Sequence, residues 1–144
     1  MRAIKFRGKH TSTGEWCYGF YCEQHMPDYD NDIPDRVTGY TTLTVLFNDE
    51  PGERSGCFWT EVKRETVGQF TTLRDKNGKD IYEGDILKVG EEESLIEVRF
   101  VRGVFAFLWN GDLDDEFPCN APTQEWAEVI GNIHDNPKLL KKNR

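Results

Sequence analysis

Acidic side chains gather in one short stretch, TVGQFTTLRDKNGKDIYEGDIL, which spans residues 66–87. Two carboxylates can act as a general acid and a general base when a cleft gives them different environments. Asp is also common in turns for a structural reason, because its side chain accepts hydrogen bonds from nearby backbone N–H groups. We interpret these acids as turn residues and not as a catalytic pair; they are Asp75, Asp80, Glu83 and Asp85.

The segment LRDKNGKDIY within this stretch predicts a β-hairpin. A two-residue turn at Asn77-Gly78 would place Asp75 opposite Asp80, and like charges that face each other across a hairpin are unfavourable. A longer loop avoids this pairing. In that loop Asp75 starts a type I turn and accepts a backbone N–H, while Gly78 takes the left-handed conformation and forms a bulge.

A second turn is predicted at YEGDILKV, directly after the hairpin. Gly84 permits a tight or left-handed turn, and Asp85 can cap it through its side chain. Ile86, Leu87 and Val89 then enter a strand. A Gly-Asp turn before an apolar strand is typical of small SH3-like barrels, which concerns the fold and carries no function by itself.

The segment DYDNDIPDRVTG, residues 28–39, opens like a calcium-binding loop, with Asp28, Asp30 and Asp32 at alternate positions. Such a loop requires Gly at its sixth position and a bidentate Glu at its twelfth. Here the sixth residue is Ile33 and the twelfth is Gly39. We therefore interpret the segment as a solvated acidic loop.

The histidines offer little metal or acid–base chemistry, because neither HExxH nor GxSxG occurs. His10 has no ligand partner at a suitable spacing. His25 lies near Cys22, but no second ligand pair is visible. His134 beside Asp135 could form an acid–base pair, although a capping role after the last strand is the simpler interpretation.

The start of the chain, MRAIKFRGKH, contains no apolar run long enough for a signal peptide, and no stretch approaches the length of a membrane span. We therefore expect the protein in the cytoplasm, with its thiols reduced. The cysteines form no CxxC pair, and we predict free, mostly buried thiols at Cys17, Cys22, Cys57 and Cys119.

A small basic cluster, Arg74, Lys76 and Lys79, lies near Phe70 and Tyr82, and cations beside aromatic rings can hold a single nucleic-acid strand. The chain as a whole has 18 Lys and Arg against 26 Asp and Glu, a net charge of −8. Binding to phosphates needs cationic surface, so nucleic acid and anionic membranes are poor partners. We interpret the aromatic residues as core, and keep nucleic-acid mimicry by the acidic surface as an alternative.

Apolar and polar residues alternate at period two through much of the chain, which predicts short strands separated by turns. Helix signals are weak, and only the tail NPKLLKKNR could add a helical turn. The segment EQHMPDYDNDIPDRVTG, with its two prolines, is predicted to be a loop. The predicted strands include residues 16–22, 43–47, 96–100, 104–109 and 125–133.

The chain of 144 residues, 37% hydrophobic and 12% aromatic, is predicted to fold as one domain without disulfides or metal. Many short strands favour a mainly β fold with a small SH3-like barrel over residues 66–136. Residues 1–65 would supply a leading β-hairpin and a loop-rich extension, and residues 137–144 a tail.

Three segments, in order, resemble the YopX family, a set of small phage and prophage proteins. They are IKFRG…GEWCYGF, ETVGQFTTLRDKNGKDIYEGDIL and EVIGNIHDNPKLL. Residues 21–62 and the loop at 110–123 match none of the family's recognisable segments. Thr72 stands where the family pattern commonly has Gly, and His134 where an aromatic or similar residue is more usual.

The resemblance implies a mainly β fold with an SH3-like barrel and a phage or prophage origin, and it is compatible with an oligomer. It implies no activity, because the family has no established biochemical function, and no catalytic residue is carried over. We therefore predict a non-enzymatic module that binds another protein or itself, with no metal and no cofactor. The alternatives are an enzyme with a metal- or carboxylate-dependent site built from scattered residues, and a protein that binds or mimics nucleic acid.

Overall fold

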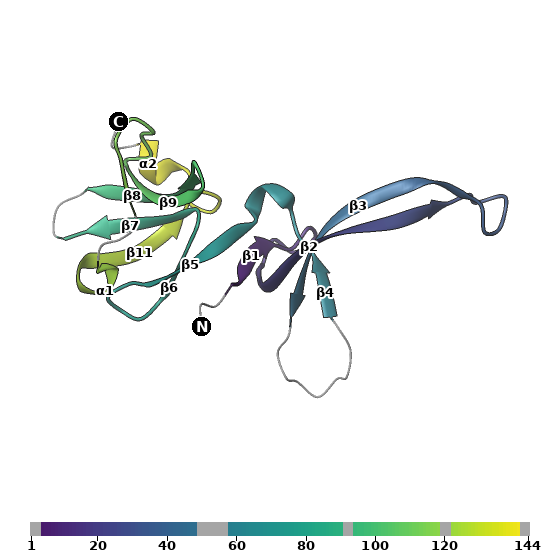
Figure 1. Cartoon of the computed structure of the whole chain (residues 1–144), viewed down its shortest axis with the longest axis horizontal. Coiled ribbons are helices and arrows are strands. Elements are labelled where there is room, and N and C mark those ends of the chain that lie inside the picture. Colours follow the sequence, from purple (N-terminus) through teal and green to yellow (C-terminus); the bar gives the residue numbers. More distant parts are fainter. Residues whose placement is uncertain (1–3, 49–57, 91–93, 119–121, 142–144) are drawn as a thin grey trace. The chain divides into compact units, whose positions relative to one another are not determined.

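A computed structural model describes residues 4–48, 58–90, 94–118 and 122–141 of the chain (Figure 1). The chain divides into two compact units: an N-terminal unit, Lys5–Val67, and a C-terminal unit that begins at Gly68. Strands dominate the described residues and the helices are short, so the predicted mainly β fold with little helix is confirmed. Within the described part of the chain, no helix combines the length and the apolar character needed to cross a membrane.

The N-terminal unit is a sheet of antiparallel strands. Its strands are β1 (Phe6–Lys9), β2 (Trp16–Tyr29), β3 (Val37–Asn48) and β4 (Phe58–Glu61), followed by a 3₁₀ turn, η1 (Arg64–Thr66). Their spatial order is β4-β3-β2-β1. Val45, Leu46 and Val62 are buried in this unit. A Cβ at Gly8 would lie 2.9 Å from Val62 Cγ2, so the close approach of the two residues requires glycine.

The segment predicted to be a loop-rich extension is instead mostly a long hairpin. β2 has 14 residues and β3 has 12. They pair from Phe20 opposite Phe47 to Tyr29 opposite Val37, with a bulge after Asp28. Along β2, only residues 16–19 pair with β1. Along β3, only residues 45–48 pair with β4. We define the two-stranded remainder, residues 23–29 and 37–43, as the arm (Figure 1).

Pro27 made this segment look like a loop, yet its position suits a strand at an edge. The N–H of Val62 donates to the carbonyl of Thr44 at 2.9 Å, so the backbone groups of Thr44 face away from β2. The direction of the backbone N–H and C=O groups alternates along a strand, so those of Tyr40 also point away from β2. Pro27 lies opposite Tyr40, so its backbone groups point away from β3. The missing N–H of Pro27 therefore lies on the outer edge, where it costs no bond to β3.

The C-terminal unit combines a hairpin with a larger antiparallel sheet. The hairpin consists of β5 (Gly68–Arg74) and β6 (Asp80–Tyr82). The other elements are β7 (Asp85–Val89), β8 (Leu95–Val101), β9 (Val104–Trp109), β10 (Glu116–Pro118), α1 (Thr123–Trp126), β11 (Ala127–Asn132) and α2 (Lys138–Lys141). Five of these strands form a sheet in the order β10-β9-β8-β7-β11.

The core of the C-terminal unit lies between the β5–β6 hairpin and the five-stranded sheet. Branched aliphatic residues, alanine and one aromatic ring share one buried cluster, and the hairpin contributes its central residue. The cluster consists of Ile81, Leu87, Ile96, Val98, Phe107 and Ala127, each fully buried.

The predicted SH3-like barrel over residues 66–136 is not confirmed. β10 and β11 stand at the two ends of the five-stranded sheet, and among the described strands they do not pair with each other. β6 has three residues and pairs with β5, so it covers the core without closing the sheet. The C-terminal unit is therefore an open antiparallel sheet.

Candidate functional site

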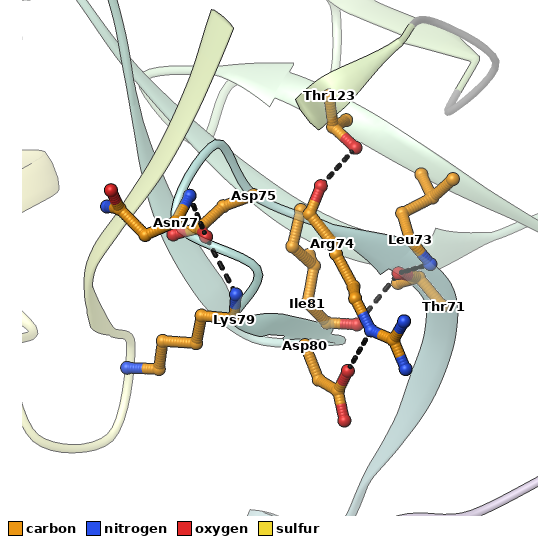
Figure 2. A network of polar contacts seen from close by, with 9 residues as sticks. All are labelled: Thr71, Leu73, Arg74, Asp75, Asn77, Lys79, Asp80, Ile81 and Thr123. Carbon is orange, nitrogen blue, oxygen red and sulfur yellow. Dashed lines mark hydrogen bonds and ion pairs between the residues drawn. The ribbon is translucent and has the colours of Figure 1, made fainter. Parts of the chain in front are cut away.

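Asp75, at the end of the β5–β6 hairpin, is a buried carboxylate whose oxygens are all engaged (Figure 2). It is 2% exposed. Its Oδ1 accepts the N–H groups of Asn77 and Lys79, each at 2.9 Å, and its Oδ2 accepts the N–H of Val129 in β11 at 3.0 Å. Burial alone would raise the pKa of Asp75, but the three N–H donors outweigh it and hold the pKa below its usual value. The ionised side chain therefore ties the hairpin turn to β11.

The turn itself is the longer loop and not the two-residue one. The N–H of Asp75 donates to Lys79 O at 2.8 Å, and the N–H of Gly78 donates to Asp75 O at 3.0 Å. Gly78 has φ +80, and nothing lies within 4 Å of the position its Cβ would take. Gly78 is therefore required for its backbone conformation and not for space.

Gly84 and Asp85 form the second predicted turn. Gly84 has φ +90; its N–H donates to Val98 O at 2.7 Å and its carbonyl accepts the N–H of Ile133 at 2.9 Å. Asp85 is 1% exposed, and its Oδ2 accepts the N–H of Tyr82 at 2.8 Å. This turn also joins the middle of the chain to the segment after β11.

The remaining acids of the opening stretch do not complete an acid–base pair. Asp80 binds the guanidinium of Arg74 at 2.9 Å, as Figure 2 shows. Burial raises the pKa of Glu83, although the N–H of Gln69 and the charge of Arg99 act in the opposite direction. With the oxygens of Asp75 bound by backbone N–H groups, we find no split pair of carboxylates facing a common cleft among these acids.

Two of the three cations of the small basic cluster form ion pairs within the fold. Arg74 pairs with Asp80, and Lys76 Nζ lies 3.3 Å from Glu128 Oε2. Phe70 and Tyr82 are buried and pack with their ring centroids 5.5 Å apart. Phe70 and Tyr82 are therefore core residues, as predicted, and neither ring is exposed for a base to stack on.

The predicted acidic loop at residues 28–35 uses its carboxylates to hold the tip of the arm. Asp28 lies in β2, and its carboxylate accepts the hydroxyl of Thr41 at 2.8 Å. Asp30 Oδ1 accepts the N–H groups of Asp32 and Ile33, which forms an Asx turn. In the parts of the chain that the structure describes, no group of three or more His, Cys, Asp and Glu side chains gathers as a metal site would require.

His10 and His25 make local hydrogen bonds. The Nδ1 of His10 accepts the N–H groups of Ser12 and Thr13, and His25 Nδ1 lies 3.0 Å from Thr42 Oγ1. Cys17 and Cys22 are free and partly exposed, not buried as predicted. The other two predicted thiols, Cys57 and Cys119, lie outside the described residues.

The turn after β11 depends on Asn132, a residue that the sequence analysis did not single out. The side-chain oxygen of Asn132 accepts the N–H groups of His134 and Asp135, and its Nδ2 donates to Asp135 Oδ2 at 3.0 Å. His134 and Asp135 thus belong to an Asx turn. The Asn-x-x-Asp spacing in NIHD is the signal that could have found it.

A hollow of about 690 Å³ lies beside the turn that follows β9. Its lining includes Arg99, Trp109, Asn110 and Asp112. The guanidinium of Arg99 is held by the buried carboxylate of Glu97 at 2.6 Å, and Asp112 Oδ1 accepts the N–H of Asp114. Arg99 and Asp112, two of the charged residues of the hollow, are therefore engaged in local contacts.

The arm carries an exposed apolar face that the sequence analysis missed. Tyr40 is 69% exposed and Tyr29 is 60% exposed. Tyr40 lies opposite Pro27, and Tyr29 lies opposite Val37, which is also exposed. On β2, Pro27 and Tyr29 are two residues apart and therefore lie on one face. Tyr40 and Val37 lie opposite them, although they are three residues apart on β3, because the register shifts at the bulge between them. Strict period-two alternation along VTGYTTLTVLFN would place Val37 and Tyr40 on opposite faces, so the sequence alone carries no signal for this face.

Comparisons with known proteins give a family but no activity. A family model described as YopX protein matches residues 5–141. No curated protein matches the chain. A solved structure, titled "Crystal structure of protein EF1440 from Enterococcus faecalis", has 26% sequence identity and a TM-score of 0.48, over 97% of this chain and 99% of that one.

Proposed function

The chain belongs to the YopX family, and from that premise we propose that it is a non-enzymatic accessory protein of phage or prophage origin that binds a protein through its arm. The exposed apolar face of the arm is the observation that carries this proposal. Tyr is enriched in the centres of protein interfaces, because its ring buries a large area at little cost in conformational entropy. We expect the protein to act in the cytoplasm of its bacterial host.

The arm would also gain stability from a partner. A two-stranded ribbon is only marginally stable in water unless further strands or a packed face support it. In residues 23–29 and 37–43, no third described strand supports the pair. A protein surface laid on Tyr29, Val37 and Tyr40 would bury apolar area that is otherwise exposed to water.

The contacts of the polar side chains also support the proposal of a non-enzymatic protein. The oxygens of Asp75 are bound by backbone N–H groups, Asp85 caps a turn, and Arg74 and Lys76 form ion pairs. Groups held in this way stabilise the fold, and they leave little chemistry for a substrate.

A capture experiment with matched variants tests the proposal. Tagged protein is exposed to nuclease-treated host lysate, and the bound proteins and the solution mass of the chain are measured in parallel. We expect wild type to retain a host protein or to self-associate. Tyr40→Ser should weaken the capture of a host protein that packs on the ring, and Val104→Ser should leave capture unchanged. Val104 is a suitable control because it is 57% exposed in the C-terminal unit. A wild-type chain that is monomeric and captures nothing would refute the proposal.

A further inference from the structure

One edge of the arm presents backbone hydrogen-bonding groups that no described strand uses. β3 pairs with β2 along its whole length, but β4 pairs with β3 only from Val45 onward, and Val62 binds the Thr44 carbonyl. The outer edge of residues 37–43 therefore has no partner strand among the described residues. An unpaired row of N–H and C=O groups is a template for another strand.

The groups that face outward follow from the geometry of the ladder. The carbonyl of Thr44 points away from β2, because it accepts the N–H of Val62. The register between Thr44 and Tyr40 is uninterrupted, so Thr42 and Tyr40 also direct their N–H and C=O groups outward. Thr41 and Leu43, between them, direct theirs toward β2.

The two edges of the arm differ in how they are protected. The residues of β2 opposite Tyr40, Thr42 and Thr44 are Pro27, His25 and Glu23. That outer edge lacks a donor at the proline and carries ionisable side chains, which are the usual devices against strand addition. The β3 segment VTGYTTL, residues 37–43, has neither proline nor any charged residue. The open edge is therefore β3.

We propose that the outer edge of β3 pairs antiparallel with the same edge of a second copy of this chain, about a twofold axis. The inference rests on the proposed protein-binding function of the arm and names the partner. Two copies with a net charge of −8 each repel, so they can meet closely only where charges are absent, and residues 37–43 meet this condition. An oppositely charged partner would find no charge on this edge to recognise.

Residues 37–43 can also pair antiparallel with the same residues of a second copy. In an isologous contact each residue faces another residue of the same segment, so a charged residue would be brought against its like. With Thr41 on the axis, Tyr40 of one copy lies opposite Thr42 of the other. Pairs of threonine with threonine or with an aromatic residue are favourable across strands. The dimer would contain a four-stranded ribbon, and a sheet needs at least three strands to be stable on its own.

The first test needs no variant. Sedimentation equilibrium from about 1 µM to about 300 µM, a range suited to a small interface, is combined with amide hydrogen exchange at both ends of the range. We expect the mass to double from 16.7 kDa at high concentration. The amides of Tyr40 and Thr42 should gain protection as the dimer forms, while those of Thr41 and Leu43 should not. Exchange at Tyr40 and Thr42 that does not depend on concentration would refute the proposal.

The second test uses two variants at one position. Tyr40→Pro removes the outward N–H that the second copy needs, without removing a bond to β2, and Tyr40→Thr loses the ring but keeps the N–H. We expect Tyr40→Pro to be monomeric and Tyr40→Thr to dimerise. Loss of the dimer in both variants would assign association to the ring and overturn the edge pairing. If Tyr40→Pro does not fold, the exchange experiment on wild type decides alone.

The two proposals fail in distinguishable ways. A wild-type chain that stays monomeric yet captures a host protein through Tyr40 would refute self-pairing and leave the binding function standing. A wild-type chain that stays monomeric and captures nothing would overturn both.

Discussion

Replacing Thr72 with glycine is expected to stabilise the C-terminal unit. Thr72 has φ +71 and lies in the irregular part of β5 between Phe70 and Arg74. The left-handed conformation brings Cβ close to a neighbouring carbonyl, and a branched Cβ makes the strain worse. Thr72 is exposed, so its side chain contributes little packing. The family pattern commonly has glycine at this position, which agrees with the backbone that the structure shows.

The size of the gain follows from two opposing terms. Removing Cβ from the left-handed region recovers about 1–2 kcal/mol of strain. The larger conformational freedom of glycine in the unfolded chain takes back about 0.5–1 kcal/mol. The net expectation is a gain of about 0.5–1 kcal/mol in the free energy of unfolding, or roughly 2–8 °C in Tm for a unit of this size.

The measurement is urea and thermal unfolding of wild type, Thr72→Gly and Thr72→Ala, followed by circular dichroism. Alanine keeps Cβ and removes only the branch, so it should gain less than glycine. The urea m-value should not change, because the surface exposed on unfolding is the same. A glycine variant that is no more stable than wild type, or an alanine variant that gains as much, would refute the strain argument.

Other expectations concern the turns of the same unit. Asp75→Asn should lower the free energy of unfolding by about 2 kcal/mol, because the carboxylate accepts three backbone N–H groups. The folded pKa of Asp75 is lowered from its usual value, so its ionised form adds stability above the unfolded pKa, and that stability disappears as pH falls through the folded pKa. The difference between wild type and Asp75→Asn should therefore shrink below about pH 4 in acid unfolding curves. Gly78→Val and Gly84→Val should each cost about 1–3 kcal/mol in thermal unfolding, because both glycines have positive φ. Gly68→Ala should be destabilising for a different reason, since its Cβ would lie 2.6 Å from the Glu83 carbonyl oxygen, and its urea midpoint should fall.

The two turns of the opening stretch could be derived from the sequence because their chemistry is local. An Asp that accepts nearby N–H groups and a glycine that supplies positive φ act within a few residues, so the pattern at Asp75 and Gly78 is sufficient to place them. The third bond of Asp75 could not be derived, because Val129 is 54 residues away in the sequence. Its meaning as a link between segments appears only in the folded chain.

The arm and the closure of the barrel could not be derived because both depend on pairing between distant strands. Pro27 ends a strand in most contexts. It is acceptable here only because its nitrogen, which has no hydrogen to donate, lies on the outer edge of the arm. Period-two alternation also misleads where a strand leaves the core. Ile96 and Val98 are buried as the alternation predicts, but Phe100 is 49% exposed, and Glu97 is buried and pairs with the partly exposed Arg99.

The division of the chain suggests where its specificity resides. Both turns of the stretch that resembles the family are bonded to the segment EVIGNIHD near the end: Asp75 to Val129, and Gly84 to Ile133. The middle and final segments of the resemblance are thus hydrogen-bonded to each other, and Asp75 and Gly84 serve to hold them together. The arm falls in residues 21–62, which match none of the family's recognisable segments. On our proposal that the arm binds a partner, transplanting residues 23–43 into another chain of the family should transfer that binding.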